Sequence, residues 1–193
     1  MIQILISMSE KYSLAEMSQM AIEGGCGWIV LHLTEESDVA SLAEDLVPLC
    51  RDAGVILTIV GPLADVRRLE AHGVYLKPGD NAIAVREELG PEAIVGITVS
   101  SASAAVTLAQ ADIDYVTLPA GTADKDAAAI IADARAAGAE IPFVLPCAAA
   151  DFEGDFAARA KAVGYAGFFI TDGLFDCDDP VARIEAVHQL VLR

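Results

Sequence analysis

Residues 72–80 read HGVYLKPGD, and this segment contains the pattern that decides the fold. The apolar run GVYL at 73–76 predicts a short buried strand, and the KPGD that follows at 77–80 predicts a tight turn. Lys77 and Asp80 therefore place two opposite charges directly after a buried strand. Either this turn is an ordinary surface loop, or it belongs to the rim of a barrel where charged groups meet a ligand.

The same pattern recurs along the whole chain. Short apolar runs stand at 2–7, 28–33, 55–60, 73–76, 93–97, 115–118, 142–145 and 167–170. Segments of helical character follow them at 13–23, 38–52, 63–71, 81–88, 101–111, 124–137, 154–163 and 179–192. Ser13 and Glu16 have the spacing of a capping box, and Pro180 suits the first turn of a helix. Glycines mark expected helix ends at Gly24, Gly54, Gly73, Gly138 and Gly164.

This alternation predicts the fold class. Strands that are apolar on both faces and alternate with helices are typical of parallel sheets built from βα units. Eight such units in 193 residues predict an α/β fold, a closed (β/α)8 TIM barrel that forms one domain over residues 1–193. The competing fold is an open doubly wound sheet. That fold favours a glycine-rich phosphate loop after the first strand, and the segment SMSEKYS at 7–13 contains no glycine.

Composition excludes several classes of partner. The chain carries 29 acidic and 12 basic residues, for a net charge of −17, and 54% of its residues are hydrophobic. A nucleic-acid groove requires clustered Lys and Arg, and an anionic membrane surface attracts basic segments, so neither partner is expected. No apolar stretch is long enough to span a membrane, and the N-terminal segment lacks an export signal. We expect a cytoplasmic protein.

The four cysteines give no sign of a metal site or a disulfide framework. They stand at 26, 50, 147 and 177, without a CxxC pair or a neighbouring histidine. This spacing favours reduced thiols. Cys147 follows the seventh strand and could be a nucleophile, but a small buried side chain is the simpler interpretation.

In a (β/α)8 barrel, the residues that act on a ligand lie at the carboxyl ends of the strands. That rule selects a set of candidates: His32, Thr34, Glu36, Lys77, Asp80, Thr98, Ser100, Thr117, Thr122, Lys125, Cys147, Thr171 and Asp172. Each has an ordinary structural alternative. His32 could be a hydrogen-bonded core histidine, Glu36 could belong to a solvated helix start, and Asp80 could cap the fourth helix.

The segment from 72 to about 125 resembles the thiamine phosphate synthase/TenI superfamily. The resemblance rests on GVYLKPGD, on AIVGITVS at 93–100 and on DYVTL at 114–118, followed by Thr122 and Lys125. Synthases of this family join an aminopyrimidine methyl diphosphate to a hydroxyethylthiazole phosphate and release pyrophosphate. The resemblance therefore implies a phosphorylated heterocycle as ligand, and family members often form homodimers.

The resemblance also implies roles for individual residues. Asp80 stands where the family has a magnesium-binding aspartate, so Mg²⁺ is implied as a cofactor. Thr98 replaces a serine near the phosphates, and Lys125 stands at a phosphate-contacting lysine with Thr122 beside it. Together with Lys77 and Ser100, these residues form the predicted phosphate-binding set. His32 matches a strand-two histidine of the TenI branch, whose members tautomerise a thiazole carboxylate phosphate, and it is the predicted proton-transfer group beside Thr98 and Lys125.

Other positions depart from the family pattern. A Gln-x-Arg-x-Lys after strand two is replaced by His32, Thr34 and Glu36, and an Asn-Asp after strand three is replaced by Val60 and Gly61. Three functions therefore remain open. The first is a synthase-like or tautomerase-like enzyme of thiamine biosynthesis. The second is a non-catalytic binding or regulatory barrel that has lost the synthase residues. The third is an enzyme on a less anionic substrate, with Glu36 or Asp172 as general base.

Overall fold

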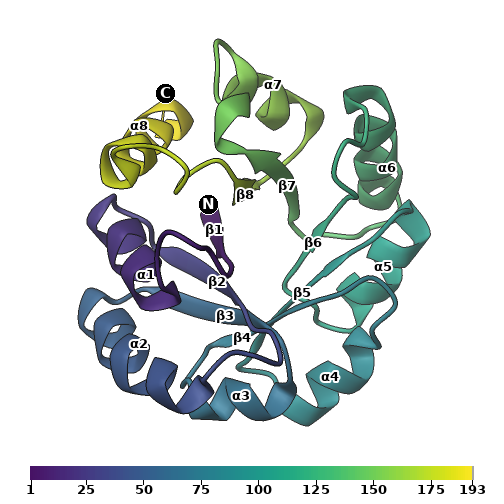
Figure 1. The fold of residues 1–193 in the computed structure, drawn as a ribbon. Coiled ribbons are helices and arrows are strands. Elements are labelled where there is room, and N and C mark those ends of the chain that lie inside the picture. The colour runs from purple at the N-terminus through teal and green to yellow at the C-terminus, as the bar shows by residue number, and fades with distance from the viewer. Residues whose placement is uncertain (193) are drawn as a thin grey trace.

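A computed structural model describes residues 1–192 and shows a closed barrel of eight parallel strands in chain order, each followed by a helix (Figure 1). The strands are β1 (Ile2–Ile6), β2 (Trp28–His32), β3 (Ile56–Val60), β4 (Gly73–Leu76), β5 (Ile94–Thr98), β6 (Tyr115–Thr117), β7 (Phe143–Ala148) and β8 (Gly167–Asp172). The predicted (β/α)8 TIM barrel is confirmed.

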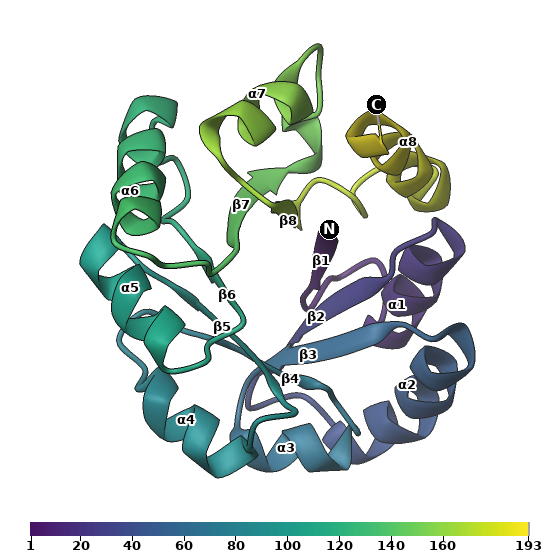
Figure 2. The same cartoon turned by 180° about the vertical axis from the view of Figure 1, so that it is seen from behind.

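The helices lie outside the ring of strands, as the view from behind also shows (Figure 2). They are α1 (Leu14–Glu23), α2 (Val39–Ala53), α3 (Leu63–Arg68), α4 (Ala82–Leu89), α5 (Ala102–Gln110), α6 (Asp124–Ala136), α7 (Phe156–Val163) and α8 (Pro180–Leu192). A short 3-10 helix, η1 (Ala149–Asp151), follows β7. Ser13 and Glu16 form the expected capping box at the start of α1.

Pairing between β1 and β8 closes the ring. Ile2 lies opposite Phe168 and Ile4 opposite Ile170, in the same parallel sense as every other pair. Because all strands run in one direction, the loops that follow them meet at one end of the barrel. We call this end the mouth. Lys77 in the loop after β4, Thr98 at the end of β5 and Lys125 in the first turn of α6 all belong to this end.

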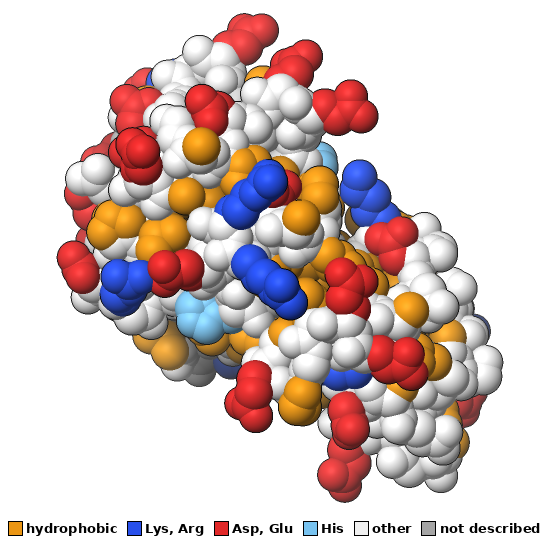
Figure 3. All heavy atoms as spheres, turned by 90° about the horizontal axis from the view of Figure 1, so that it is seen from below, with side chains coloured by type: hydrophobic (Ala, Val, Ile, Leu, Met, Phe, Trp, Pro, Cys, Tyr) orange, Lys and Arg blue, Asp and Glu red, His pale blue; other side chains and the backbone are white. Residues whose placement is uncertain are grey.

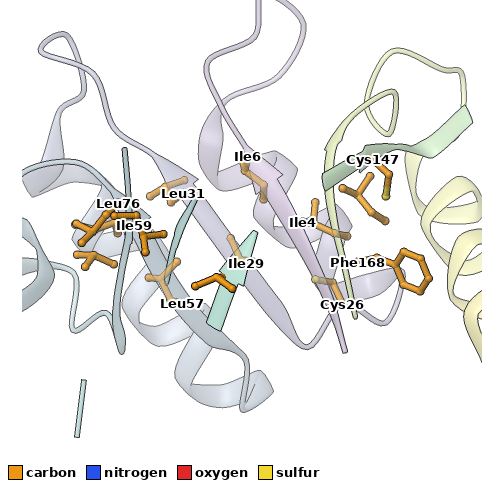
Figure 4. Close-up of a cluster of buried hydrophobic side chains, with 14 of the residues drawn as sticks. Ile4, Ile6, Cys26, Ile29, Leu31, Leu57, Ile59, Leu76, Cys147 and Phe168 are labelled. Atoms are coloured by element: carbon orange, nitrogen blue, oxygen red, sulfur yellow. The ribbon is translucent and has the colours of Figure 1, made fainter. Parts of the chain in front are cut away.

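Two apolar layers hold the barrel together, because side chains alternate between its two faces. Side chains that point outward pack against the helices, among them Ile4 and Ile6 of β1 and Leu57 and Ile59 of β3 (Figure 4). Side chains that point inward form a second cluster, which is rich in aromatic rings: Trp28, Val30, Val60, Tyr115, Val144 and Phe169. These side chains therefore fill the barrel interior at this level.

Gly73 begins the strand predicted at 73–76, but it is not the helix end that was also predicted for it. It opens β4, and α3 ends earlier than expected, at Arg68. A Cβ atom at Gly73 would lie 1.8 Å from the carbonyl oxygen of Ile94 on the neighbouring strand. The glycine is therefore required by the close approach of β4 and β5, which the sequence pattern does not reveal.

Gly96 on β5 is a second position of close approach. A Cβ atom there would lie 2.1 Å from the ring of Tyr115, which is almost fully buried on the next strand. The missing side chain makes room for this ring inside the barrel. Tyr115 in turn stacks on Tyr75 with 6.1 Å between ring centroids and contacts Trp28 edge-on at 5.5 Å.

Candidate functional site

Within residues 1–192, three hollows lie at the mouth. The β2–β4 hollow has a volume of about 520 Å³ and is lined by His32, Thr34, Glu35, Val60, Tyr75, Lys77 and Asp80, among others. The β4–β6 hollow, of about 660 Å³, is lined by Asp80, Thr98, Ser100, Thr107 and Pro119, among others. Asp80 lines both of these hollows, so they adjoin. The β8–β1 hollow, of about 510 Å³, lies where the loops after β1 and β8 meet.

Lys77 and Asp80 are held by the turn that the sequence singled out. The carboxylate of Asp80 accepts a hydrogen bond of 2.9 Å from the backbone N–H of Lys77, and Asn81 caps α4 through the N–H of Ala84. The cap is therefore Asn81, and Asp80 instead closes the turn after β4. Lys77 is exposed and forms no ion pair with residues 1–192, so its ammonium group is available to a ligand.

Below these charges lies a cluster of three hydroxyl groups. The Tyr75 hydroxyl lies 2.7 Å from the hydroxyls of both Thr98 and Thr117, which are 3.0 Å apart. Tyr75 and Thr98 are half-buried and line the β2–β4 and β4–β6 hollows respectively, whereas Thr117 is fully buried. This cluster gives the floor of the two adjoining hollows a neutral, polar surface.

Tyr75 was not among the residues selected from the sequence, because it resembles any other ring in an apolar strand. The pairing of β5 with β6 points to Tyr75, because Thr98 lies opposite Thr117 there. Two threonines at one level of a barrel interior predict a polar partner on the adjoining strand. Tyr75 is that partner.

His32 ends β2 and is half-buried in the β2–β4 hollow. It follows Trp28 and Val30 at alternate positions, and both of these side chains belong to the interior cluster. Period two therefore directs His32 toward the barrel interior, above the aromatic layer. Its opposite partner on β3 is Val60.

Of the three remaining residues of the predicted phosphate-binding set, one lines a hollow and two do not. Ser100 lines the β4–β6 hollow, but Thr122 donates its hydroxyl to the carbonyl of Pro119 at 2.6 Å and lies in the turn before α6. Lys125 is exposed in the first turn of α6. Neither Thr122 nor Lys125 is among the residues that line the hollows described above. Their roles toward phosphate stay predictions.

Cys147 lacks the character of a nucleophile. It is buried, and desolvation together with the nearby charge of Asp151 raises the pKa of its thiol to about 12. The reactive form of cysteine is the thiolate, which is scarce at neutral pH when the pKa is this high. Cys26 is likewise buried, and desolvation raises the pKa of its thiol to about 11. Both side chains fill the apolar layer (Figure 4).

The magnesium site that the resemblance implies does not fit these residues as a protein-held centre. Within residues 1–192, no group of three His, Cys, Asp or Glu side chains is arranged to hold a metal ion. Asp80 is the one carboxylate on the wall that the two adjoining hollows share, and one of its oxygens already accepts from Lys77. Mg²⁺ commonly needs one or two carboxylates together with substrate phosphates. We therefore derive no step through magnesium, and the metal stays a prediction.

Comparison with known proteins places the chain first in a class and then in a family. The barrel matches the structure of a thiamine phosphate pyrophosphorylase from Pyrococcus furiosus with a TM-score of 0.81 over 99% of this chain and 95% of that one, at 18% identity. It also matches orotidine 5'-phosphate decarboxylase from Pyrococcus horikoshii with a TM-score of 0.72 over 100% of both chains, at 12% identity. At these identities the likeness defines the fold class, a (β/α)8 barrel.

Sequence comparison identifies the family. Residues 3–149 match the family model described as thiamine monophosphate synthase. The thiamine-phosphate synthase of Haloarcula marismortui is 32% identical over 96% of this chain and 92% of that protein. The Bacteroides fragilis thiamine-phosphate synthase is 36% identical over 103 residues, and that match spans 50% of the relative's length. The chain belongs to the thiamine monophosphate synthase family.

Proposed function

We propose that the chain acts in thiamine biosynthesis and binds a phosphorylated heterocycle across the two adjoining hollows of the mouth. The observation that supports this most strongly is the arrangement around Asp80. Lys77 supplies a free cation on one side of the shared wall, Ser100 supplies a hydroxyl on the other, and the hydroxyl cluster forms the floor. Charged groups at the rim and a neutral floor suit a ligand with a phosphorylated end and a planar ring.

The reaction we propose is the one that the family implies. The ring nitrogen of a thiazole attacks the methylene carbon of an aminopyrimidine methyl diphosphate, so that a C–N bond forms. The C–O bond to the diphosphate breaks, and pyrophosphate departs with the bonding electrons. Lys77 would stabilise the departing negative charge, because a fixed cation beside the leaving group lowers the free energy of the transition state in which that charge develops.

The remaining residues would take supporting roles. Ser100 and Thr98 would position the diphosphate end, and Lys125 would add a second positive charge from α6. His32, which also lines the β2–β4 hollow, would exchange a proton with the bound ring if the chain follows the tautomerase branch instead. A homodimer remains a further prediction, and so does a cytoplasmic location. No helix within residues 1–192 has the length and apolar character needed to cross a membrane.

The experiment that tests this proposal is a product assay. The purified protein is incubated with the pyrimidine diphosphate and either the thiazole alcohol or its phosphate, and thiamine or thiamine phosphate is detected by chromatography. We expect product with the unmodified chain and at least about tenfold less with Lys77→Met, which corresponds to about 1.4 kcal/mol of transition-state stabilisation. Arg67→Met is the matched control, because it removes one exposed positive charge from α3, outside the three hollows of the mouth.

Two results would contradict the proposal. Absence of product from every combination, with the pyrimidine diphosphate still bound, would favour the non-catalytic binding barrel. Absence of both product and binding would remove the proposed substrate class altogether.

A further inference from the structure

The β8–β1 hollow differs in charge from the other side of the mouth. In (β/α)8 barrels, the loops after the seventh and eighth strands, with a short extra helix, frequently form a phosphate site. Here the corresponding elements are η1 and the segment that follows Asp172. The hollow beside them is lined by three carboxylates, Glu10, Asp172 and Asp176.

Two backbone donors that could contact a phosphate already bind carboxylates of the chain itself. The N–H of Ala148 donates to Asp151 at 2.8 Å, and the N–H of Gly173 donates to Asp172 at 2.7 Å. Pro146, within β7, has no N–H to offer. An incoming phosphate would have to displace a carboxylate or approach it closely, and both are unfavourable.

The cations near this end are also engaged. Lys11 lines the β8–β1 hollow, but its ammonium group donates to the carbonyl oxygen of Cys177 at 2.8 Å. Arg183 on α8 donates to the carbonyl oxygen of Ala149 at 3.0 Å. Three carboxylates therefore line this hollow beside a single lining cation, Lys11, and the ammonium of Lys11 and the guanidinium of the nearby Arg183 both donate to backbone carbonyls.

The base of the same hollow suits an uncharged ring. Leu5, Ile170, Leu174 and Phe175 contribute apolar surface, and Ser7, Ser9 and Thr171 contribute hydroxyls at its edge. A planar heterocycle could cover the apolar surface. An alcohol on that ring could donate to a carboxylate, which makes a charge-assisted hydrogen bond stronger than a neutral one.

From this geometry we propose that the β8–β1 hollow selects the second ring of the reaction as a free alcohol and rejects its phosphate ester. The inference rests on the proposed function for the identity of the ring, the hydroxyethylthiazole. The pyrimidine would then carry the only phosphates of the reacting pair, on the opposite side of the mouth. The acidic surroundings would also favour the positive charge that develops on the thiazole nitrogen as the C–N bond forms.

The test compares binding of the thiazole alcohol and of its phosphate by ligand-observed NMR titration at low salt. We expect the alcohol to bind at least about tenfold more tightly than the phosphate. Added salt should lower this affinity ratio, because salt screens the repulsion between the phosphate and the exposed carboxylates. The variant Asp172→Asn/Asp176→Asn should reduce this affinity ratio by about fivefold or more. It removes two negative charges, and each would repel a phosphate with the modest strength expected between exposed charges. Asparagine at 172 still carries an oxygen that can accept from Gly173.

The matched control is Asp45→Asn/Asp133→Asn, which removes the same net charge from exposed positions on α2 and α6. It should leave the ratio unchanged. Tighter binding of the phosphate ester, binding of neither compound, or an equal effect of both double variants would each overturn the inference. Binding of the alcohol without binding of the pyrimidine diphosphate would support this inference and contradict the proposed function. Product formed only from the thiazole phosphate would support the proposed function and contradict this inference.

Discussion

At the scale of single residues, burial distinguishes the cysteines from one another. Cys26, Cys50 and Cys147 are buried, whereas Cys177 is half-buried in the loop before α8. The pKa of the Cys147 thiol stays near 12, so raising the pH from 7 to 9 leaves it protonated. An acid whose pKa is raised by folding stabilises the native state at low pH and loses that contribution only as the pH rises toward the raised value.

We therefore predict that Cys177 is alkylated first in the native protein. Iodoacetamide labelling at pH 8, followed by mass spectrometry of the peptides, should show Cys177 modified well before Cys147. Labelling in denaturant should modify all four cysteines and serves as the control. If Cys147 reacted as fast as Cys177 in the native state, it would have to be an activated thiol, and its interpretation as an apolar filler would be wrong.

Gly96→Ala should destabilise the barrel strongly, because the added methyl group would meet the Tyr115 ring at 2.1 Å. Overpacking of a filled core costs about 1–3 kcal/mol, and we expect the upper end here, since both neighbours are strands of a closed ring. Denaturant unfolding measures the loss. Gly27→Ala is the matched control, because nothing lies within 4 Å of the new atom. If the two variants were equally stable, Gly96 would have no packing role.

At the scale of elements, one ion pair joins a helix to two strands at the end opposite the mouth. Arg86 of α4 is buried and pairs with Asp114, which precedes β6, and it also donates to the carbonyl oxygen of Gly90 at 2.9 Å. Asp114 in turn accepts from the N–H of Val95 on β5 at 2.7 Å. The pair thus fixes α4, β5 and β6 to one another.

Asp114→Ala should cost about 2–3 kcal/mol of unfolding free energy, because it leaves the Arg86 guanidinium buried without its partner. The half-exposed carboxylate keeps this below the loss expected of a fully buried pair. The double variant Arg86→Met/Asp114→Ala should be more stable than Asp114→Ala alone, since the buried charge is then absent. Chemical denaturation of the unmodified protein, Asp114→Ala, Arg86→Met and the double variant checks this. If the double variant lost the sum of the two single losses, Arg86 and Asp114 would not interact.

The elements also show what the sequence could predict. Alternation of apolar runs and helical segments predicted every β-strand and α-helix, with most ends within two residues, because local burial and capping determine them. It did not predict the short helix η1. It predicted a shorter β7 than the observed Phe143–Ala148, since Pro146 interrupts the apolar run and argues against a strand. It also extended α3 to residue 71, whereas the helix ends at Arg68 and Glu70 adopts a positive φ of 46°, which no local pattern signals at a glutamate.

The site was less predictable than the fold. The rule that ligands bind at strand ends selected Lys77, Asp80, Thr98 and His32, and all four lie in the hollows of the mouth. The sequence could not show that Asp80 closes a turn onto Lys77, or that Tyr75 joins Thr98 and Thr117. Side-chain hydrogen bonds between separate strands depend on the register of the closed sheet, which local patterns do not contain.

At the scale of the whole molecule, the net negative charge affects the stability of the fold. The net charge is −17, and acidic side chains are spread over the face seen in Figure 3. Like charges held together in a compact fold repel one another, and salt screens that repulsion over a Debye length of about 10 Å at 0.1 M. Added salt should therefore stabilise the folded state more than it stabilises the expanded unfolded chain.

We predict that the melting temperature rises as NaCl is raised from about 0.05 to 1 M. Differential scanning calorimetry measures the change. The variant Asp45→Lys/Asp133→Lys lowers the excess negative charge at two exposed helical positions, and its melting temperature should depend less steeply on salt. A melting temperature that fell, or that did not change with salt in either protein, would show that surface repulsion does not limit stability.

The central claim is that the mouth binds a phosphorylated heterocycle through the charges around Asp80. Calorimetric titration with the aminopyrimidine methyl diphosphate, with and without Mg²⁺, tests this claim most directly. The account predicts saturable binding to the unmodified chain, weakened about tenfold in Lys77→Met and unchanged in Arg67→Met. Flat heats for the unmodified chain under both conditions, or equal affinities in the two variants, would contradict it.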